Sequence, residues 1–442
     1  MPTGSTFGEL IAQAAAHHGA GRLREAEASY RAALALSPGH AAVINNLGVI
    51  AAAEGLYAAA IALFDDAIAY EPGHVAAHYN RGAALAALGR TLEAIKGFSR
   101  VCALDPGHYE AHRALGFLWL AAGDRGRSLD HFARTYELRR GDDRLDGRAK
   151  FLTFATRSKL HHDAEQFRYL AERRRDRARF DALARAYESV TTDFPDQPTE
   201  LSPQLQELLG DDYNTAIAVS DSPEMAAGAV AVRRDVEDLT RQFQAGPTGA
   251  ICFDDLLTPQ ALAALRRFLL ESTIWHDFSH IGGFIASYLE DGLACPLVLQ
   301  IADEIRKAFP GLLAEHPLSQ AWAFKGLEGS SAVDVHADDA AITLNFWITP
   351  TAANLTPDRG GLAVCREPPP PDWEMTGYEA DQERIVAFLE QNGGNTLRVP
   401  YRENRAVLFE SRLFHASDQP VFAPSYENHR INVTFLFGRH KP

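Results

Sequence analysis

A period of 34 residues runs through the first third of the chain and constrains its fold more than any other feature of the sequence. The tripeptide Pro-Gly-His recurs in steps of 34 residues, beginning at Pro38, Pro72 and Pro106. One aromatic series and two glycine series keep the same step: Tyr30, Phe64, Phe98 and Phe132; Gly48, Gly82 and Gly116; and Gly21, Gly55, Gly89 and Gly123. Four series in one register predict a repeat array, in which each unit buries its apolar face against its neighbours.

Each repeat contains two stretches with helical spacing. Apolar residues recur three and four positions apart, as in Ile61, Phe64 and Ile68, which is the pattern of an amphipathic helix. A small residue such as Gly48 lets a partner helix approach closely, and the aromatic residue of the second helix fills the wedge between hairpins. The sequence therefore predicts a domain of stacked helical hairpins over residues 1–142.

These residues resemble the tetratricopeptide repeat family, with four repeats over about residues 7–142. The small residues of the family pattern fall in two series: Ala14, Gly48, Gly82 and Gly116, and Ala26, Ala60, Ala94 and Ser128. The fourth repeat departs from the pattern at its end, where Arg140 stands in place of a proline. The resemblance implies an α-helical solenoid whose concave groove binds a peptide or protein, with a spacer or dimerisation module as the alternative.

The charge of the chain narrows the class of its partners. The 442 residues include 43 Lys and Arg against 58 Asp and Glu, which gives a formal net charge of −15. Such a surface repels phosphate backbones and anionic lipids, so we expect no nucleic-acid binding and no membrane binding. No stretch approaches the roughly 20 apolar residues of a bilayer span, and the four cysteines form no CxxC pair. These features predict a soluble, cytoplasmic protein and leave its oligomeric state open.

Residues 143–247 form a charged middle segment that we expect to be a helical connector. It contains His161 and Asp163, the ends of a His-X-Asp triplet of the kind that can bind a metal ion. On a helix, side chains two positions apart diverge by about 200°, so these two cannot easily share one ion. We therefore interpret the triplet as helix surface.

From residue 248 to residue 442 the pattern changes to short β-rich runs. Strands are expected at residues 250–253, 321–324, 342–348, 362–364, 406–409 and 431–437. Two helices are expected at about residues 258–271 and 293–309. Many short strands separated by loops favour an antiparallel sandwich or barrel, with the helices covering one face.

One of these predicted strands has a mixed pattern. Asn345 and Trp347 alternate with Leu344 and Phe346. Successive strand residues point to opposite faces, so one pair is expected to face the core and the other solvent or substrate. Core packing is the commoner role for a residue such as Trp347.

Two histidines and an aspartate near the C-terminal strands are candidate metal ligands. His336 and Asp338 form a second His-X-Asp triplet before the strand at 342–348, and His415 follows the strand at 406–409. With 17 histidines in the chain, one such triplet is expected by chance. In extended chain, however, residues two apart point the same way and can converge on one ion. Two imidazoles and one carboxylate form the facial triad that binds non-haem Fe(II) and leaves three positions open.

The last predicted strand carries an arginine on its polar face. Apolar residues alternate there with Arg430, Asn432 and Thr434. An arginine on the interior face of a barrel is costly unless it is paired. A dicarboxylate co-substrate offers it a bidentate partner.

The triad and the arginine strand resemble the 2-oxoglutarate- and Fe(II)-dependent dioxygenases over about residues 248–440. The resemblance implies a double-stranded β-helix, a jelly-roll or cupin-like barrel, with His336, Asp338 and His415 as the catalytic iron ligands. It also implies that Arg430 binds the distal carboxylate of 2-oxoglutarate and that Asn432 lies where a hydroxyl residue often assists. The implied cofactor and co-substrates are Fe(II), 2-oxoglutarate and O2, and the implied reaction is C–H hydroxylation with release of succinate and carbon dioxide.

Two aspects of this site stay open. Arg430 lies 15 residues after His415, which is longer than usual in the family, so three other arginines are rivals for the carboxylate: Arg398, Arg402 and Arg405. The substrate side is also undefined, although an expected loop at residues 273–290 supplies candidates: His276, His280 and Tyr288.

The favoured function is a hydroxylase acting on a peptide or protein that the repeats recruit. One alternative is a hydroxylase of a small metabolite, with the repeats serving assembly. Two others lack oxidative chemistry: a cupin-like metal-binding barrel, and a repeat scaffold whose barrel is degenerate.

Overall fold

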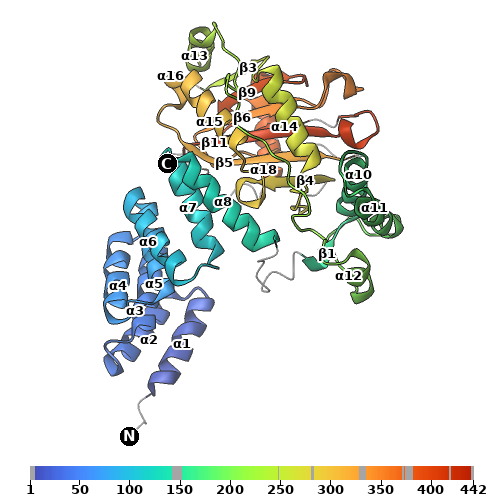
Figure 1. The fold of residues 1–442 in the computed structure, drawn as a ribbon. Helices are drawn as coiled ribbons and strands as arrows, with labels where there is room; N and C mark the ends of the chain where they lie inside the picture. Colours follow the sequence, from blue (N-terminus) through green and yellow to red (C-terminus); the bar gives the residue numbers. More distant parts are fainter. Residues whose placement is uncertain are drawn as a thin grey trace. The chain divides into compact units, whose positions relative to one another are not determined.

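The computed structural model describes residues 5–141, 152–246, 248–279, 283–327, 335–370, 373, 382–417 and 420–439. In it the chain divides between Thr135 and Tyr136 into two compact units, and the division falls inside helix α8 (Figure 1). The second unit takes in both the expected connector and the expected C-terminal domain.

Paired helices build the first unit, one pair for each 34-residue repeat. Their bounds are α1 (Phe7–Gly19), α2 (Leu23–Leu36), α3 (Ala41–Ala53), α4 (Tyr57–Tyr70), α5 (Val75–Ala87), α6 (Thr91–Leu104), α7 (Tyr109–Ala121) and α8 (Arg125–Arg140). The start of α1 is fixed by Thr6 and Glu9, whose side chains each accept a hydrogen bond from the other residue's backbone N–H. The predicted stack of helical hairpins is confirmed.

The periodic glycines and aromatics contact each other inside each repeat. A Cβ atom added at Gly48 would lie 2.5 Å from the ring of Phe64, and one at Gly116 would lie 2.7 Å from the ring of Phe132. Only glycine leaves room for the aromatic ring at these positions. The other glycine series lies in the turns, where Gly55 has a φ of 77°, a conformation that disfavours side chains.

The second unit begins with helices that pack beside two sheets. The described elements of this helical part are β1 (Phe154–Ala155), α10 (Arg157–Arg173), α11 (Arg177–Thr191), β2 (Thr199–Glu200), α12 (Pro203–Leu209) and α13 (Val236–Gln244). Helices α10 and α11 share an apolar cluster that includes Phe167, Phe180 and Tyr187. Helix α10 also contacts the larger sheet through His162, whose Nε2 lies 3.2 Å from Nζ of the strand residue Lys325.

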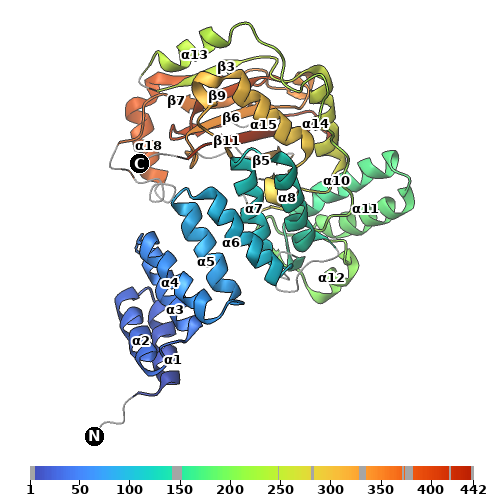
Figure 2. The same ribbon diagram turned by 60° about the vertical axis from the view of Figure 1, so that its left-hand side comes forward.

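The larger sheet has six antiparallel strands in the order β3-β9-β6-β11-β5-β4. Their bounds are β3 (Ala250–Phe253), β4 (Phe284–Tyr288), β5 (Leu318–Gly326), β6 (Ile342–Trp347), β9 (Ala406–Glu410) and β11 (Arg430–Phe437). Helices α14 (Pro259–Glu271) and α15 (Pro296–Ala308) lie against this sheet in both views (Figures 1 and 2). The short helix α16 (Pro310–Leu313) follows α15.

The smaller sheet has three antiparallel strands in the order β10-β7-β8. Its elements are β7 (Leu362–Cys365), β8 (Thr396–Val399) and β10 (His415–Ala416), with helix α18 (Gln382–Asn392) between β7 and β8 in the chain. Short 3-10 helices occur in the second unit at Leu289–Asp291, Thr351–Ala353, Gly393–Asn395 and Tyr426–Asn428.

The six-stranded and the three-stranded sheet each bury one face against the other sheet. Trp347, Val407 and Phe409 of the six-stranded sheet share an apolar cluster with Leu362 and Val364 of the three-stranded sheet. We call the faces that meet in this cluster the inner faces. Alternation along β6 places Thr343 and Asn345 on the inner face together with Trp347.

The sequence patterns predicted most of these elements. The six expected strands and both expected helices are confirmed, but patterning missed β4, β8 and β10, as well as the short pair β1 and β2 in the expected helical connector. Strand β4 lies inside the region 273–290 that was expected to be a loop. Among the described residues the six-stranded and the three-stranded antiparallel sheets share no strand, so a closed barrel is not confirmed. No described helix has the length and apolar character needed to cross a bilayer.

Candidate metal centre

The three predicted ligands lie together in the second unit. One ligand atom from each of His336, Asp338 and His415 falls within 4.8 Å of the others. His415 Nε2 is 3.5 Å from Oδ2 of Asp338, and His336 Nε2 is 3.9 Å from Oδ1 of the same carboxylate. Among the described residues this is the one group of three or more such side chains that could hold a metal ion.

Backbone hydrogen bonds bring these side chains together. His336 and His415 form an antiparallel bridge, in which each N–H donates to the carbonyl of the other at 3.1 Å and 2.9 Å. The backbone N–H of Asp338 donates to the carbonyl of Ser411 at 2.9 Å. Strand β10 pairs with β7 and places His415 opposite Val364, whose side chain lies in the cluster between the sheets. The triad therefore lies on the inner side of the three-stranded sheet.

Neighbouring groups orient two of the ligands. His415 Nδ1 lies 3.0 Å from the carbonyl oxygen of Leu413. A carbonyl can only accept, so Nδ1 carries the proton and Nε2 keeps its lone pair for a metal. Thr343 Oγ1 donates to Asp338 Oδ2 at 2.8 Å. Thr343 is a supporting residue that sequence reasoning missed, although it shares the alternation of Asn345 and Trp347 on β6.

Burial favours the metal-binding form of the site. Burial, together with repulsion from His336, lowers the pKa of His415 to about 4, so its imidazole is neutral at neutral pH. A histidine must be neutral to coordinate a metal. Asp338 and His415 are buried, whereas the side chain of His336 is 35% exposed.

The donor set fits an Fe(II) centre of the facial-triad type. Two imidazole nitrogens and one carboxylate oxygen are the ligands of that class, and they leave coordination positions for other molecules. The same donors also suit Mn(II), Co(II) and Zn(II), because the affinity of a nitrogen and oxygen site for divalent metals depends on the metal as well as on the ligands.

Arg430 and Asn432 lie on the inner face of β11. Arg430 is 4% exposed and donates from Nε to the carbonyl of Gly360 at 2.8 Å and from Nη1 to Oδ1 of Asn432 at 3.2 Å. In the sheet, Asn432 lies opposite Trp347 of β6. Arg430, the residue predicted to bind the co-substrate carboxylate, thus presents a buried guanidinium on the same sheet face as Thr343. Thr343 in turn donates a hydrogen bond to Asp338.

The rival arginines are placed differently. Arg402 and Arg405 both bind the carboxylate of Asp254, with an Nη1–Oδ2 distance of 2.7 Å for Arg402 and an Nη2–Oδ2 distance of 3.0 Å for Arg405. Arg398 lies opposite Ala363, one residue from Val364, which pairs with His415. Adjacent strand residues point to opposite faces, so the side chains of Arg398 and His415 leave the three-stranded sheet on opposite sides.

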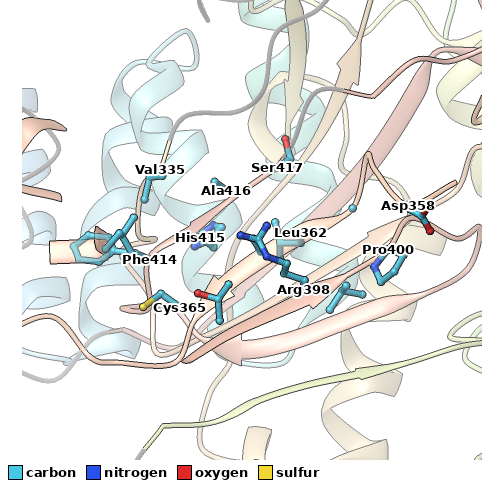
Figure 3. Close-up of a pocket in the computed structure, with 15 residues that line it drawn as sticks. Val335, Asp358, Leu362, Cys365, Arg398, Pro400, Phe414, His415, Ala416 and Ser417 are labelled. Carbon is cyan, nitrogen blue, oxygen red and sulfur yellow. The ribbon is translucent and has the colours of Figure 1, made fainter. Parts of the chain in front are cut away.

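Arg398 borders a cavity of about 410 Å³. Phe414 and Cys365 form part of its apolar wall, and His415 also borders it (Figure 3). The guanidinium of Arg398 is exposed and lies close to the smaller sheet, but the strand register places it on the sheet face opposite the metal site.

The predicted surface triplet in the connector is partly wrong. His161 and Asp163 do not converge, as expected for a helix, but His162 and Asp163 are buried at 0% and 5% exposure. Asp163 binds Lys159 with both Oδ–Nζ distances at 2.7 Å, and His162 Nδ1 lies 3.0 Å from the same carboxylate. Helix α10 is buried on more than one side, so the prediction that the triplet lies on the helix surface is wrong for His162 and Asp163.

One of the three predicted substrate-side residues needs correction. His276 is 2% exposed and lies 2.9 Å from both the hydroxyl of Tyr136 and Oδ1 of Asn214, so it is a buried structural group. Tyr288 is the last residue of β4 and is half-buried. His280 lies outside the described residues.

A model of the Tetratricopeptide repeat family matches residues 11–69 and 56–108. The N-terminal region therefore consists of tetratricopeptide repeats, as the 34-residue period predicted. No curated protein matches the chain.

Several solved structures are similar to part of the chain. They include a crystal structure of MamA, 21% identical over 30% of this chain and 77% of that chain, with a TM-score of 0.29. MamA from Desulfovibrio magneticus RS-1 is 23% identical over 31% of this chain and 78% of that chain, with a TM-score of 0.30. The first repeat domain of Spaghetti, bound to an HSP90 peptide, is 25% identical over 26% of this chain and 90% of that chain, with a TM-score of 0.25. With scores this low, these similarities carry no weight for function.

Proposed function

We propose that the second unit is a 2-oxoglutarate- and Fe(II)-dependent dioxygenase that hydroxylates a C–H bond. The observation that carries the proposal is the convergence of His336, Asp338 and His415 on the inner side of the three-stranded sheet, while the facing inner side of the six-stranded sheet bears the buried Arg430. The two inner faces together offer a metal site and a guanidinium for a carboxylate.

The order of the strands supports a double-stranded β-helix for this unit. After β6 the chain passes to the smaller sheet in β7 and β8, returns to the larger sheet in β9, and alternates again in β10 and β11. Alternation between two facing antiparallel sheets is the chain path of a jelly roll.

The residues of this chain have separable roles in the proposed reaction. When bound, the iron supplies the oxidation of 2-oxoglutarate and substrate by O2, which releases succinate and carbon dioxide. Thr343 and the Leu413 carbonyl hold Asp338 and His415 in the orientation that coordination needs. Arg430 binds and orients a carboxylate in a buried setting, where a charge-assisted pair is stronger than in water.

Binding of 2-oxoglutarate explains the site better than metal binding alone. Asn345 Oδ1 and Trp347 Nε1 are buried on the inner face of β6 and have no hydrogen-bond partner. A metal-binding barrel without a co-substrate gives no reason for a buried arginine and unsatisfied polar atoms on one wall.

We propose that the repeats present a peptide or protein to this site. Consecutive first helices carry amides that meet across the repeat boundary, since Asn80 Nδ2 donates to Oδ1 of Asn45 at 2.9 Å. Arg113, on the first helix of the fourth repeat, is exposed. Holding a long substrate in a groove raises the effective concentration of its target side chain, whereas a small metabolite gains nothing from the array.

The test keeps the chain whole and replaces Asn46, Asn80 and Arg113 together by alanine. After thermal unfolding confirms that the variant is folded, it should hydroxylate its substrate from host extract with a lower kcat/KM, detected by mass spectrometry as one added oxygen atom. Its 2-oxoglutarate requirement should stay unchanged. An unchanged kcat/KM would favour a small metabolite as substrate.

A second candidate function is a repeat scaffold without catalysis, because the family match lies wholly within the repeats. Succinate formation separates the two. If the iron-loaded protein, supplied with 2-oxoglutarate, O2 and host extract, forms no more succinate than a sample without iron, the scaffold takes the place of the enzyme.

A further inference from the structure

Two buried polar atoms on β6 have no hydrogen-bond partner among the described residues, and both lie in one strand beside the candidate metal centre. They are Oδ1 of Asn345, a residue 9% exposed, and Nε1 of Trp347, a residue 0% exposed. Folded proteins rarely leave such atoms unsatisfied, since each loses its hydrogen bonds to water without replacement. A ligand or ordered water is the usual reason for the exception.

Their positions lie between the two ends of the proposed site. Inner-face residues follow each other along β6 as Thr343, Asn345 and Trp347, and Thr343 holds the metal ligand Asp338. At the other end, the Cζ atom of Arg430 lies 5.9 Å from the centroid of the Trp347 ring. A molecule that reaches from the metal to Arg430 therefore passes along Asn345 and Trp347.

The chemistry of the two groups points to an acidic ligand. The indole Nε1–H of Trp347 can only donate. Asn345 Nδ2 lies 3.0 Å from Oγ1 of Thr434, and a rotation of the amide by 180° lets Oδ1 accept from that hydroxyl and frees Nδ2 as a donor. Together with Arg430, the wall then offers donors and no acceptor in need of a partner.

We propose that Trp347 and Asn345 are binding residues for 2-oxoglutarate, with Trp347 donating to the carboxylate that Arg430 holds and Asn345 donating to another oxygen of the same molecule. This inference rests on the proposed function. It gives Trp347 a role beyond packing, although its ring also packs with Leu362 and Val364 between the sheets.

Binding of 2-oxoglutarate to protein loaded with Mn(II), measured by calorimetry, tests the proposal without turnover. Trp347→Phe keeps an aromatic ring but removes the N–H together with part of the indole, so 2-oxoglutarate should bind about tenfold to a hundredfold more weakly. The melting temperature of the ligand-free protein should fall by less than in a Trp→Phe variant at a position where the N–H is hydrogen-bonded, because both variants lose packing but the N–H of Trp347 has no protein partner to lose.

Trp275→Phe is the matched control. The Nε1–H of Trp275 donates to the carbonyl of Leu269 at 2.9 Å, and the residue is 1% exposed. This variant should have a lower melting temperature and an unchanged affinity for 2-oxoglutarate. Equal weakening by both variants would mean that the effect is general damage and would overturn the proposal.

A second variant guards against misfolding of the first. Asn345→Asp keeps the shape and places a negative charge on the wall, so binding should weaken at least tenfold. Wild-type affinity in both Trp347→Phe and Asn345→Asp would overturn the inference while leaving the proposed function intact. No binding of 2-oxoglutarate by the wild-type protein would remove the proposed function and this inference with it.

Discussion

The two units of this protein encode their structure in opposite ways. In the first, each defining contact joins residues close in sequence, as between Gly48 and Phe64, and recurs with every repeat. In the second, the defining contacts join distant residues once only, as between His336 and His415. The comparison teaches that a periodic sequence reveals its fold and little chemistry, whereas single residues in a sheet reveal chemistry only after folding brings them together.

Removing a metal ligand should give the largest effect and should be confined to the second unit. Asp338→Ala takes away the one carboxylate of the triad, so we expect metal affinity and turnover to fall at least about a hundredfold. Metal content after dialysis, measured by mass spectrometry, checks this. Retention of stoichiometric Fe(II) by the variant would exclude the triad.

The other His-X-Asp triplet provides the control. Asp163→Ala should leave metal content unchanged but destabilise the second unit by about 3 to 5 kcal/mol, because Lys159 and His162 stay buried without their partner. Denaturant unfolding measures that loss. A fall in metal content in a folded Asp163→Ala protein would contradict the proposed separation of the two triplets.

Loss of the guanidinium should change co-substrate binding rather than metal binding. Arg430→Ala removes a charge-assisted pair worth about 2 to 4 kcal/mol, so the 2-oxoglutarate requirement should rise by roughly thirtyfold to a thousandfold. Arg405→Ala breaks the pair with Asp254 and a hydrogen bond to the carbonyl of Pro400, both away from Arg430, and should leave that requirement unchanged. If Arg405→Ala raised the 2-oxoglutarate requirement and Arg430→Ala did not, the carboxylate would bind at Arg405, and its assignment to the inner face of β11 would be wrong.

A substitution in the repeats should have the opposite distribution of effects. The Cβ of Gly48→Ala would collide with the Phe64 ring, so the first unit should lose about 1 to 3 kcal/mol of stability. Gly8→Ala, in open space in α1, should cost nothing. Metal binding should be the same in both variants, and a change with Gly48→Ala would mean that the repeats influence the metal centre.

Acid should weaken the first unit modestly through a histidine pair. His112 Nδ1 lies 3.0 Å from Nδ1 of His131. Burial, with repulsion from His131, lowers the pKa of His112 to about 4 from its ordinary value of 6.5. Between these two pH values the unfolded chain binds more protons, so stability falls as pH is lowered from 6.5 to 4. His112→Gln should flatten the dependence of the melting temperature by a few degrees; an unchanged slope would contradict it.

The parts that sequence reasoning predicted are those with a local signal. The repeat helices follow from the 34-residue period, and the convergence of His336 with Asp338 follows from extended chain. Strand β10 could not be found, because it has two residues and is defined by its partners. The burial of His162 was missed because it depends on Lys325, a residue of a distant strand.

The central claim is that the second unit uses O2 and 2-oxoglutarate at an iron site, and isotopically labelled O2 tests it most directly. With the iron-loaded full-length protein, 2-oxoglutarate and host extract, mass spectrometry should find one labelled oxygen atom in succinate and one in a hydroxylated product, and neither with Asp338→Ala. Unlabelled succinate and products from the wild-type protein would contradict the claim and leave the repeats as the functional part of the chain.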